Sequence, residues 1–136
     1  MWTSTGRKLE RVGGGNLHHG QAVNSLVASK LSSRFASGGN DGVVKITDHT
    51  KRKWTKEIYG SPDSEVIGVA FSSDERFLAA SRANRTIEIF DVASKELVST
   101  VETESMCGKI EFFNNDRFII AAGRDGLVRI LSIPKK

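Results

Sequence analysis

This chain of 136 residues contains one structural unit three times. An Arg-Phe pair recurs in each copy, at Phe35, Phe77 and Phe118, and is followed by small residues, a turn and an alternating apolar run. The turn and the run align without gaps over 41–48, 84–91 and 125–132, and successive turns begin 43 and 41 residues apart. A fixed period of this length predicts a repeat architecture, in which each unit covers the apolar face of its neighbour.

The middle copy shows how one unit is built. Polar and apolar residues alternate over 86–90, so Ile87 and Ile89 share one face of a strand. The run 77–81 is almost wholly apolar and small, which is expected of a strand that is buried on both faces. With two flanking β-rich segments, the copy predicts four antiparallel strands. These strands are expected at 66–72, 77–81, 86–90 and 96–101.

The outer copies repeat this order, with one strand missing at the end of the chain. We expect strands at 23–28, 35–38, 43–47 and 53–59 in the first copy, and at 108–113, 118–123 and 127–133 in the last. Residues 2–12 align with 90–100 at a constant offset, so 7–12 matches a fourth strand. This segment either pairs with the last sheet, or it lies loose or against the first sheet. For a single chain we favour the loose or first-sheet placement. Phe35, Phe77 and Phe118 are expected at equivalent, buried positions.

These repeats resemble those of the WD40-repeat family. The turn Asp of that family corresponds to Asp41 and Asp125, with Asn84 in the middle copy, and its strand-ending Trp is kept only at Trp2. The resemblance implies an all-β fold, a partial WD40-like β-propeller of about three four-stranded antiparallel blades. The single domain, 1–136, is then divided into an outer strand with a glycine-rich loop at 1–17, blade 1 at 18–60, blade 2 at 61–103 and an incomplete blade 3 at 104–136.

Ring closure is left open by the sequence. Propellers have about four to eight blades, and three blades of this size do not close a ring. The chain is therefore a piece of a longer propeller, or joins another chain, or forms an open stack. Two copies would supply six blades.

The sequence offers no pattern of catalytic or cofactor chemistry. His18 and His19 lack metal-ligand spacing, the glycines at 13–15 lack the spacing of a phosphate loop, and the acidic residues fall in turns. We therefore predict no enzyme, metal or cofactor. The single cysteine, Cys107, and the absence of an apolar leader favour an intracellular location, cytoplasmic or nuclear.

The resemblance implies a non-catalytic scaffold that recruits other proteins through loops at one end of the blades. Residues at the turns and at the starts of first strands would face the partner, and we single out Asn24, Asn40, Lys109 and Arg124. Two alternatives remain. The net charge of +4 suits a module that binds RNA or an anionic membrane through Lys51, Arg52, Lys53 and Lys56. The second alternative is a truncated propeller fragment without autonomous activity. In either case the chain could self-associate or be completed by another propeller chain.

Overall fold

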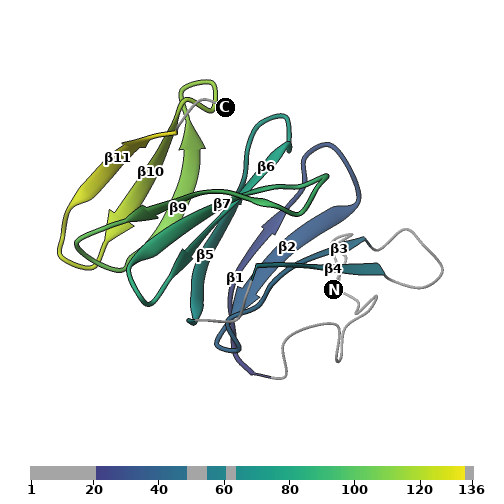
Figure 1. The fold of residues 1–136 in the computed structure, drawn as a ribbon, viewed down its shortest axis with the longest axis horizontal. Coiled ribbons are helices and arrows are strands. Elements are labelled where there is room, and N and C mark those ends of the chain that lie inside the picture. Colours follow the sequence, from purple (N-terminus) through teal and green to yellow (C-terminus); the bar gives the residue numbers. More distant parts are fainter. Residues whose placement is uncertain (1–20, 49–54, 61–63, 134–136) are drawn as a thin grey trace, which may run out of the picture.

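The structure is a computed structural model that describes residues 21–48, 55–60 and 64–133, and these residues form three antiparallel sheets without a helix (Figure 1). Sheet 1 has the order β1-β2-β3-β4, sheet 2 the order β5-β6-β7-β8, and sheet 3 the order β11-β10-β9. The strands are β1 Val23–Ala28, β2 Arg34–Gly39, β3 Val44–Asp48, β4 Thr55–Tyr59, β5 Val66–Phe71, β6 Phe77–Arg82, β7 Thr86–Asp91, β8 Leu97–Glu102, β9 Cys107–Phe113, β10 Phe118–Gly123 and β11 Val128–Ser132.

The three sheets are stacked like blades, with the first strand of each at the inner edge. Strand β5 lies against both β1 and β9, so the inner strands converge while the later strands spread outward (Figure 1). The all-β class, the antiparallel order and the partial propeller predicted from the repeats are confirmed. Strands were predicted within a few residues of where they lie, because turn residues and period-2 patterns mark them locally.

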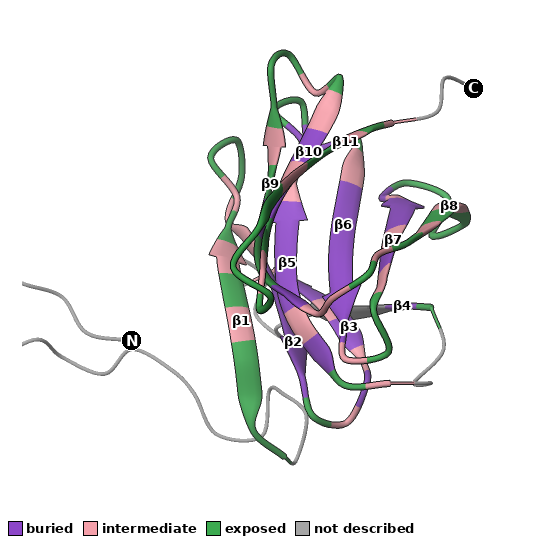
Figure 2. Ribbon diagram, turned by 90° about the vertical axis from the view of Figure 1, so that its left-hand side faces the viewer, coloured by how far each residue is buried: buried purple, intermediate pink, exposed green. Residues whose placement is uncertain are grey.

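The apolar core consists of two clusters, one between each pair of neighbouring sheets. Between sheets 1 and 2, Val44 and Ile46 face Val69, Leu78 and other residues of sheet 2. Between sheets 2 and 3, Ile87 and Ile89 face residues of sheet 3 that include Ile110 and Ile119. Figure 2 shows that most of β5 and β6 of the middle sheet is buried, whereas β1 is largely exposed.

The three phenylalanines do not occupy equivalent buried positions, and this expectation was wrong. Phe77 pairs with Asp91 and Phe118 with Ser132 at the same place in their sheets, but Phe35 pairs one position further along, with Thr47. The second strand of the first copy has one residue fewer before its turn, so Phe35 points to the opposite face. All three side chains are half-buried. The segment 7–12, predicted as a fourth strand, lies outside the described residues.

Candidate protein-interaction surface

The turns between second and third strands form one end of the blades, here called the turn end. Each turn is fixed by one side chain that accepts a hydrogen bond from the backbone N–H two residues later: Asp41 from Val43 (3.0 Å), Asn84 from Thr86 (3.3 Å) and Asp125 from Leu127 (3.2 Å). Such bonds hold a turn without help from the rest of the fold. The turn end is therefore a set of three similarly shaped loops on rigid sheets.

The middle turn departs from its neighbours in one backbone feature. Gly42 and Gly126 take the left-handed conformation, with φ of 78° and 86°. Arg85 stands at the equivalent place with φ of 68°, a conformation that costs a non-glycine residue about 1 kcal/mol or more. Its side chain is exposed, and no ion pair of Arg85 is found among the described residues. The turn end thus presents a cation at a position where glycine would be less strained.

Asn24 and Asn40 come together at the first turn. The side-chain amide of Asn24 donates to the Asn40 side-chain oxygen at 2.7 Å and to the backbone carbonyl of Val66 at 3.0 Å. Since Val66 opens β5, this one amide connects β1, the turn after β2 and sheet 2. Both asparagines remain exposed, so the pair fixes the local shape and still faces solvent.

Arg82 is the main connector beneath the turn end, and sequence reasoning missed it. Its side chain is buried, and its Nη1 donates to the carbonyls of Gly42 (2.8 Å) and Ser64 (2.6 Å), while its Nε pairs with Glu88. One guanidinium thus holds the turn of sheet 1 and the segment before β5 against sheet 2. In sequence Arg82 only ends an apolar run, and its two carbonyl acceptors lie 18 and 40 residues away.

Arg124 and Lys109 are placed apart. Arg124 is exposed in the β10–β11 turn, whose backbone is held by a hydrogen bond from the Arg124 N–H to the Met106 carbonyl at 2.9 Å. Lys109 lies within β9, and its ammonium is 3.9 Å from the Glu111 carboxylate. The structure therefore groups Arg124 with the turn end and sets Lys109 along the inner strands.

Arg129, the arginine of β11 next to this turn, is already neutralised by the Asp125 carboxylate. Arg129 donates two hydrogen bonds to the Asp125 carboxylate, at 2.6 Å and 3.0 Å. These bonds, aided by the Leu127 N–H, lower the pKa of Asp125 to about 2, and the same carboxylate raises the pKa of Arg129. Arg124, in contrast, is exposed and has no ion pair among the described residues.

At the opposite end, neighbouring sheets are joined by a repeated carboxylate contact. Glu75 accepts hydrogen bonds from the Ser29 hydroxyl at 2.6 Å and from the Lys30 N–H at 2.9 Å. Asp116, the equivalent residue of sheet 3, accepts from the Ser73 N–H at 3.0 Å and from the Ser73 hydroxyl. Both carboxylates sit in left-handed turns. These contacts join sheet 1 to sheet 2 and sheet 2 to sheet 3 at the end opposite to the turn end.

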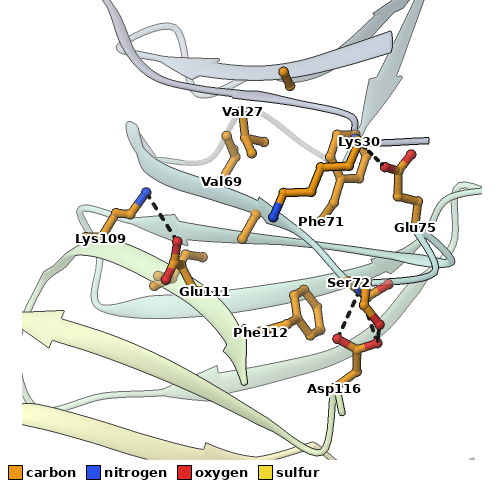
Figure 3. Close-up of a pocket in the computed structure, with 14 residues that line it drawn as sticks. Val27, Lys30, Val69, Phe71, Ser72, Glu75, Lys109, Glu111, Phe112 and Asp116 are labelled. Atoms are coloured by element: carbon orange, nitrogen blue, oxygen red, sulfur yellow. Dashed lines mark hydrogen bonds and ion pairs between the residues drawn. The ribbon is translucent and has the colours of Figure 1, made fainter. Parts of the chain in front are cut away.

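A groove of about 290 Å³ runs along the inner strands (Figure 3). Apolar side chains from all three sheets form its walls: Val27, Val69, Phe71 and Phe112 are among them. The carboxylates at its rim are occupied, since Glu75 and Asp116 hold neighbouring turns and Glu111 pairs with Lys109. Figure 3 shows the Lys30 side chain reaching across the groove. The groove is small and mixed in character, and its polar groups serve mainly to join the blades.

Several candidate residues fall outside what the structure describes. Lys51, Arg52 and Lys53 of the basic run, the histidines 18 and 19 and the glycines 13–15 lie there. Lys56 lies in β4 opposite Thr47, but its side chain is likewise outside the description. The RNA or membrane hypothesis therefore stays a prediction.

The described part of the chain gives no sign of a metal site or a membrane-spanning helix. Within 21–48, 55–60 and 64–133, no three histidine, cysteine or acidic side chains gather closely enough to hold a metal ion. No helix in these ranges has the length and apolar character needed to cross a membrane. Cys107 is a buried thiol that packs in the core between sheets 2 and 3.

Two family models match the sequence. The WD domain, G-beta repeat, matches residues 15–48, and the WD40 domain of anaphase-promoting complex subunit 4 matches residues 50–113. The matches thus cover the first two copies and the start of the third.

Three curated relatives show the range of similarity. The chain is 27% identical over 123 residues to small ribosomal subunit protein RACK1z of Oryza sativa subsp. japonica, covering 85% of this chain and 36% of that protein. It is 30% identical over 96 residues to a DDB1- and CUL4-associated factor 11 homolog of Caenorhabditis elegans, covering 65% and 16%. It is 31% identical over 84 residues to WD repeat-containing protein 1 of Xenopus tropicalis, covering 60% and 14%. The chain therefore spans little more than a third, or less, of these relatives.

Proposed function

Because the chain belongs to the WD40-repeat family, we propose that it is a non-catalytic scaffold that holds a protein partner at the turn end. The observation that carries this proposal is that the turn end combines hydrogen-bonded turns with exposed polar side chains. Turns closed by Asp41, Asn84 and Asp125 are held on stacked sheets, and exposed polar side chains stand on them. Rigid sheets that present loops in fixed positions are a common basis for protein recognition.

The partner-facing residues of this proposal are the exposed ones of the turn end. Asn24 and Asn40 form a preorganised amide pair, which lowers the entropy lost when a partner binds. Arg85 and Arg124 add cations without a described ion pair, and arginine is enriched at interface positions that dominate affinity. Lys109 belongs to the surface along the inner strands, so we assign it a secondary role. The free, buried thiol of Cys107 supports action in a reducing compartment, the cytoplasm or nucleus.

Quantitative proximity labelling in cells tests the proposal. The wild-type chain and an Arg124→Glu variant would be fused to the same labelling enzyme, and the labelled proteins compared. We expect a defined set of proteins to lose labelling by about tenfold or more, because reversing a charge at an interface typically costs more than 1.4 kcal/mol.

The matched control is Arg117→Glu, which makes the same change in an exposed residue at the opposite end of the same sheet. The proteins lost with Arg124→Glu should be retained with Arg117→Glu. Equal losses in both variants, or no loss in either, would contradict a partner site at the turn end. Circular dichroism of both purified variants verifies that the sheets remain folded.

A further inference from the structure

The groove along the inner strands lies over β5, with β1 on one side and β9 on the other (Figure 3). Its lining residues come from all three sheets, so its shape depends on how these sheets stack. A further sheet beyond sheet 1 or sheet 3 would cover an outer face of the stack and would leave the inner strands in place. The groove is therefore a feature of the three described sheets, whatever stacks beside them.

The acidic side chains that line the groove are engaged within the chain. Glu75 accepts hydrogen bonds from the turn of sheet 1, and the Arg34 guanidinium lies 3.7 Å from its carboxylate. Asp116 accepts hydrogen bonds from the turn of sheet 2. The Glu111 carboxylate is 3.9 Å from the Lys109 ammonium. These carboxylates therefore leave the groove without a strongly unpaired negative charge.

Lys30 supplies an unpaired cation. Its backbone N–H is held by the Glu75 carboxylate at 2.9 Å, which fixes where the side chain starts. Its ammonium forms no ion pair within 21–48, 55–60 and 64–133, and Figure 3 shows the side chain directed across the groove. A cation above apolar walls is complementary to a ligand that carries a carboxylate beside an apolar group.

The size of the groove indicates what fills it. Its volume of about 290 Å³ is at the lower limit of the roughly 300–1,000 Å³ of sites that hold a whole small molecule. Val27, Phe71 and Phe112 are half-buried, so each side chain presents apolar surface to the groove. Interfaces between proteins are commonly anchored by one bulky side chain that fills such a pocket. The groove thus suits an anchoring side chain better than a cofactor.

The backbone of β5 favours an inserted side chain over an added strand. No strand lies along the inner edge of β5 among the described residues. The Val69 N–H on this edge is nevertheless occupied, because it donates to the Ser25 hydroxyl of β1 at 3.1 Å. A strand that paired here would lose this donor, which strand addition requires.

We propose that the groove binds an extended segment of a partner protein that carries a bulky apolar side chain and, two residues away, a carboxylate. Side chains at this spacing lie on the same side of an extended chain. The apolar side chain contacts the walls formed by Phe71 and Phe112, and the carboxylate pairs with the Lys30 ammonium. The groove is separate from the turn end, so this site does not rest on the proposed function.

Fluorescence polarisation with short labelled peptides tests the site on the full chain. The probe has Phe-Ser-Glu at its centre, and the comparison peptides have Phe-Ser-Lys or Ala-Ser-Glu there. The wild-type chain should bind the probe at least tenfold more tightly than either comparison peptide. Lys30→Glu should reverse the preference and bind the Phe-Ser-Lys peptide more tightly, because the charges are exchanged. A merely structural role of Lys30 would not produce this reversal.

The matched control is Lys95→Glu, the same change at an exposed lysine in the β7–β8 turn, and it should bind like wild type. Arg124→Glu, altered at the turn end, should also keep the preference, which separates this test from that of the proposed function. Ala28→Phe fills the groove from an exposed position of β1 and should abolish binding, while circular dichroism verifies the fold.

Two results would overturn the proposal. One is a wild-type chain that binds the three peptides equally or binds none of them. The other is a preference that Lys30→Glu leaves unchanged. Sodium laurate, a fatty-acid anion, is a further probe of the same groove. Binding of laurate that Ala28→Phe abolishes, without binding of the peptides, would show that the groove holds a lipid acid and not a protein segment.

Discussion

Sheets 2 and 3 are built from nearly the same pattern and differ in how many neighbours they have. Strand β7 (Thr86–Asp91) and strand β11 (Val128–Ser132) both alternate between two faces. In sheet 2 both faces are covered, and Ile87 and Ile89 are buried. In sheet 3 one face packs on sheet 2 through Ile110 and Ile119, while the other leaves Ile130 exposed. Side chains at the same positions of the repeat are thus buried in the core of sheet 2 and exposed on the surface of sheet 3.

The polar contacts of the two sheets differ in the same way. Arg82 of sheet 2 is buried and serves three acceptors, which lie in the turn of sheet 1, in the segment before β5 and in β7. At the corresponding strand end of sheet 3, Gly123 replaces it, and Arg129 instead pairs with Asp125 within its own turn. A buried ion pair with several hydrogen bonds becomes a local, more accessible one. The contribution of each contact to stability should follow this difference in burial.

The largest expected effect is the loss of Arg82. Arg82→Met would leave the Gly42 and Ser64 carbonyls without their donor and Glu88 without its partner, so we expect the free energy of unfolding to fall by about 3 to 5 kcal/mol. Urea denaturation followed by tryptophan fluorescence measures this loss. Arg117→Met removes an exposed arginine of sheet 3 and is the control. A loss below about 1 kcal/mol for Arg82→Met would mean that the sheets do not depend on this contact.

The next effect compares equivalent apolar positions. Ile89→Ala removes a side chain buried between sheets 2 and 3 and should cost about 2 to 5 kcal/mol. Ile130→Ala removes an exposed side chain, and its cost should stay within about 0.5 kcal/mol. Thermal and urea denaturation of the two variants give both values. Equal losses would show that the face of sheet 3 is covered within a single chain.

A smaller effect concerns the backbone of the turns. Arg85→Gly relieves a left-handed φ of 68° but increases the freedom of the unfolded chain, so the net gain in stability should be about 0.5 to 1 kcal/mol. Gly126→Ala is the reverse test in sheet 3, where a new Cβ meets no atom within 4 Å. That variant should lose about 1 kcal/mol for conformational reasons alone. If Arg85→Gly lowers stability, the Arg85 side chain makes a stabilising contact.

The smallest effect depends on pH. The pKa of Asp125 is lowered to about 2 in the folded chain, so the ionised carboxylate stabilises the fold above the ordinary pKa of 3.8. This contribution is lost as the pH falls from about 4 towards 2. Asp125→Asn keeps the turn acceptor, as Asn84 does in sheet 2, but lacks the charge. The stability difference between wild type and variant should therefore shrink over that range, and a constant difference would argue against the Arg129 pair.

Local sequence signals were sufficient for the strands and turns. The alternation over 86–90 and the turn residues Asp41, Asn84 and Asp125 predicted the observed elements, because strand faces and turn hydrogen bonds depend on residues only a few positions apart. The candidates Asn24, Asn40 and Arg124 were singled out through the resemblance to WD40 repeats, and the structure places all three, exposed, at the turn end. The proposed role of these residues stays a prediction for binding experiments.

What the sequence by itself determined is therefore the repeat, its strands and its turns, each set by short-range pattern. Tertiary structure alone decided which strand faces are covered and which polar groups join the blades. Ile87 and Val128 show the first point, since they hold the same register position but the first is buried and the second is exposed. Arg82 and Glu75 show the second, because their partners lie up to 46 residues away. Exposure of Ile130 likewise depends on what stacks beside it, and a pattern of period 2 specifies a face without specifying its neighbour.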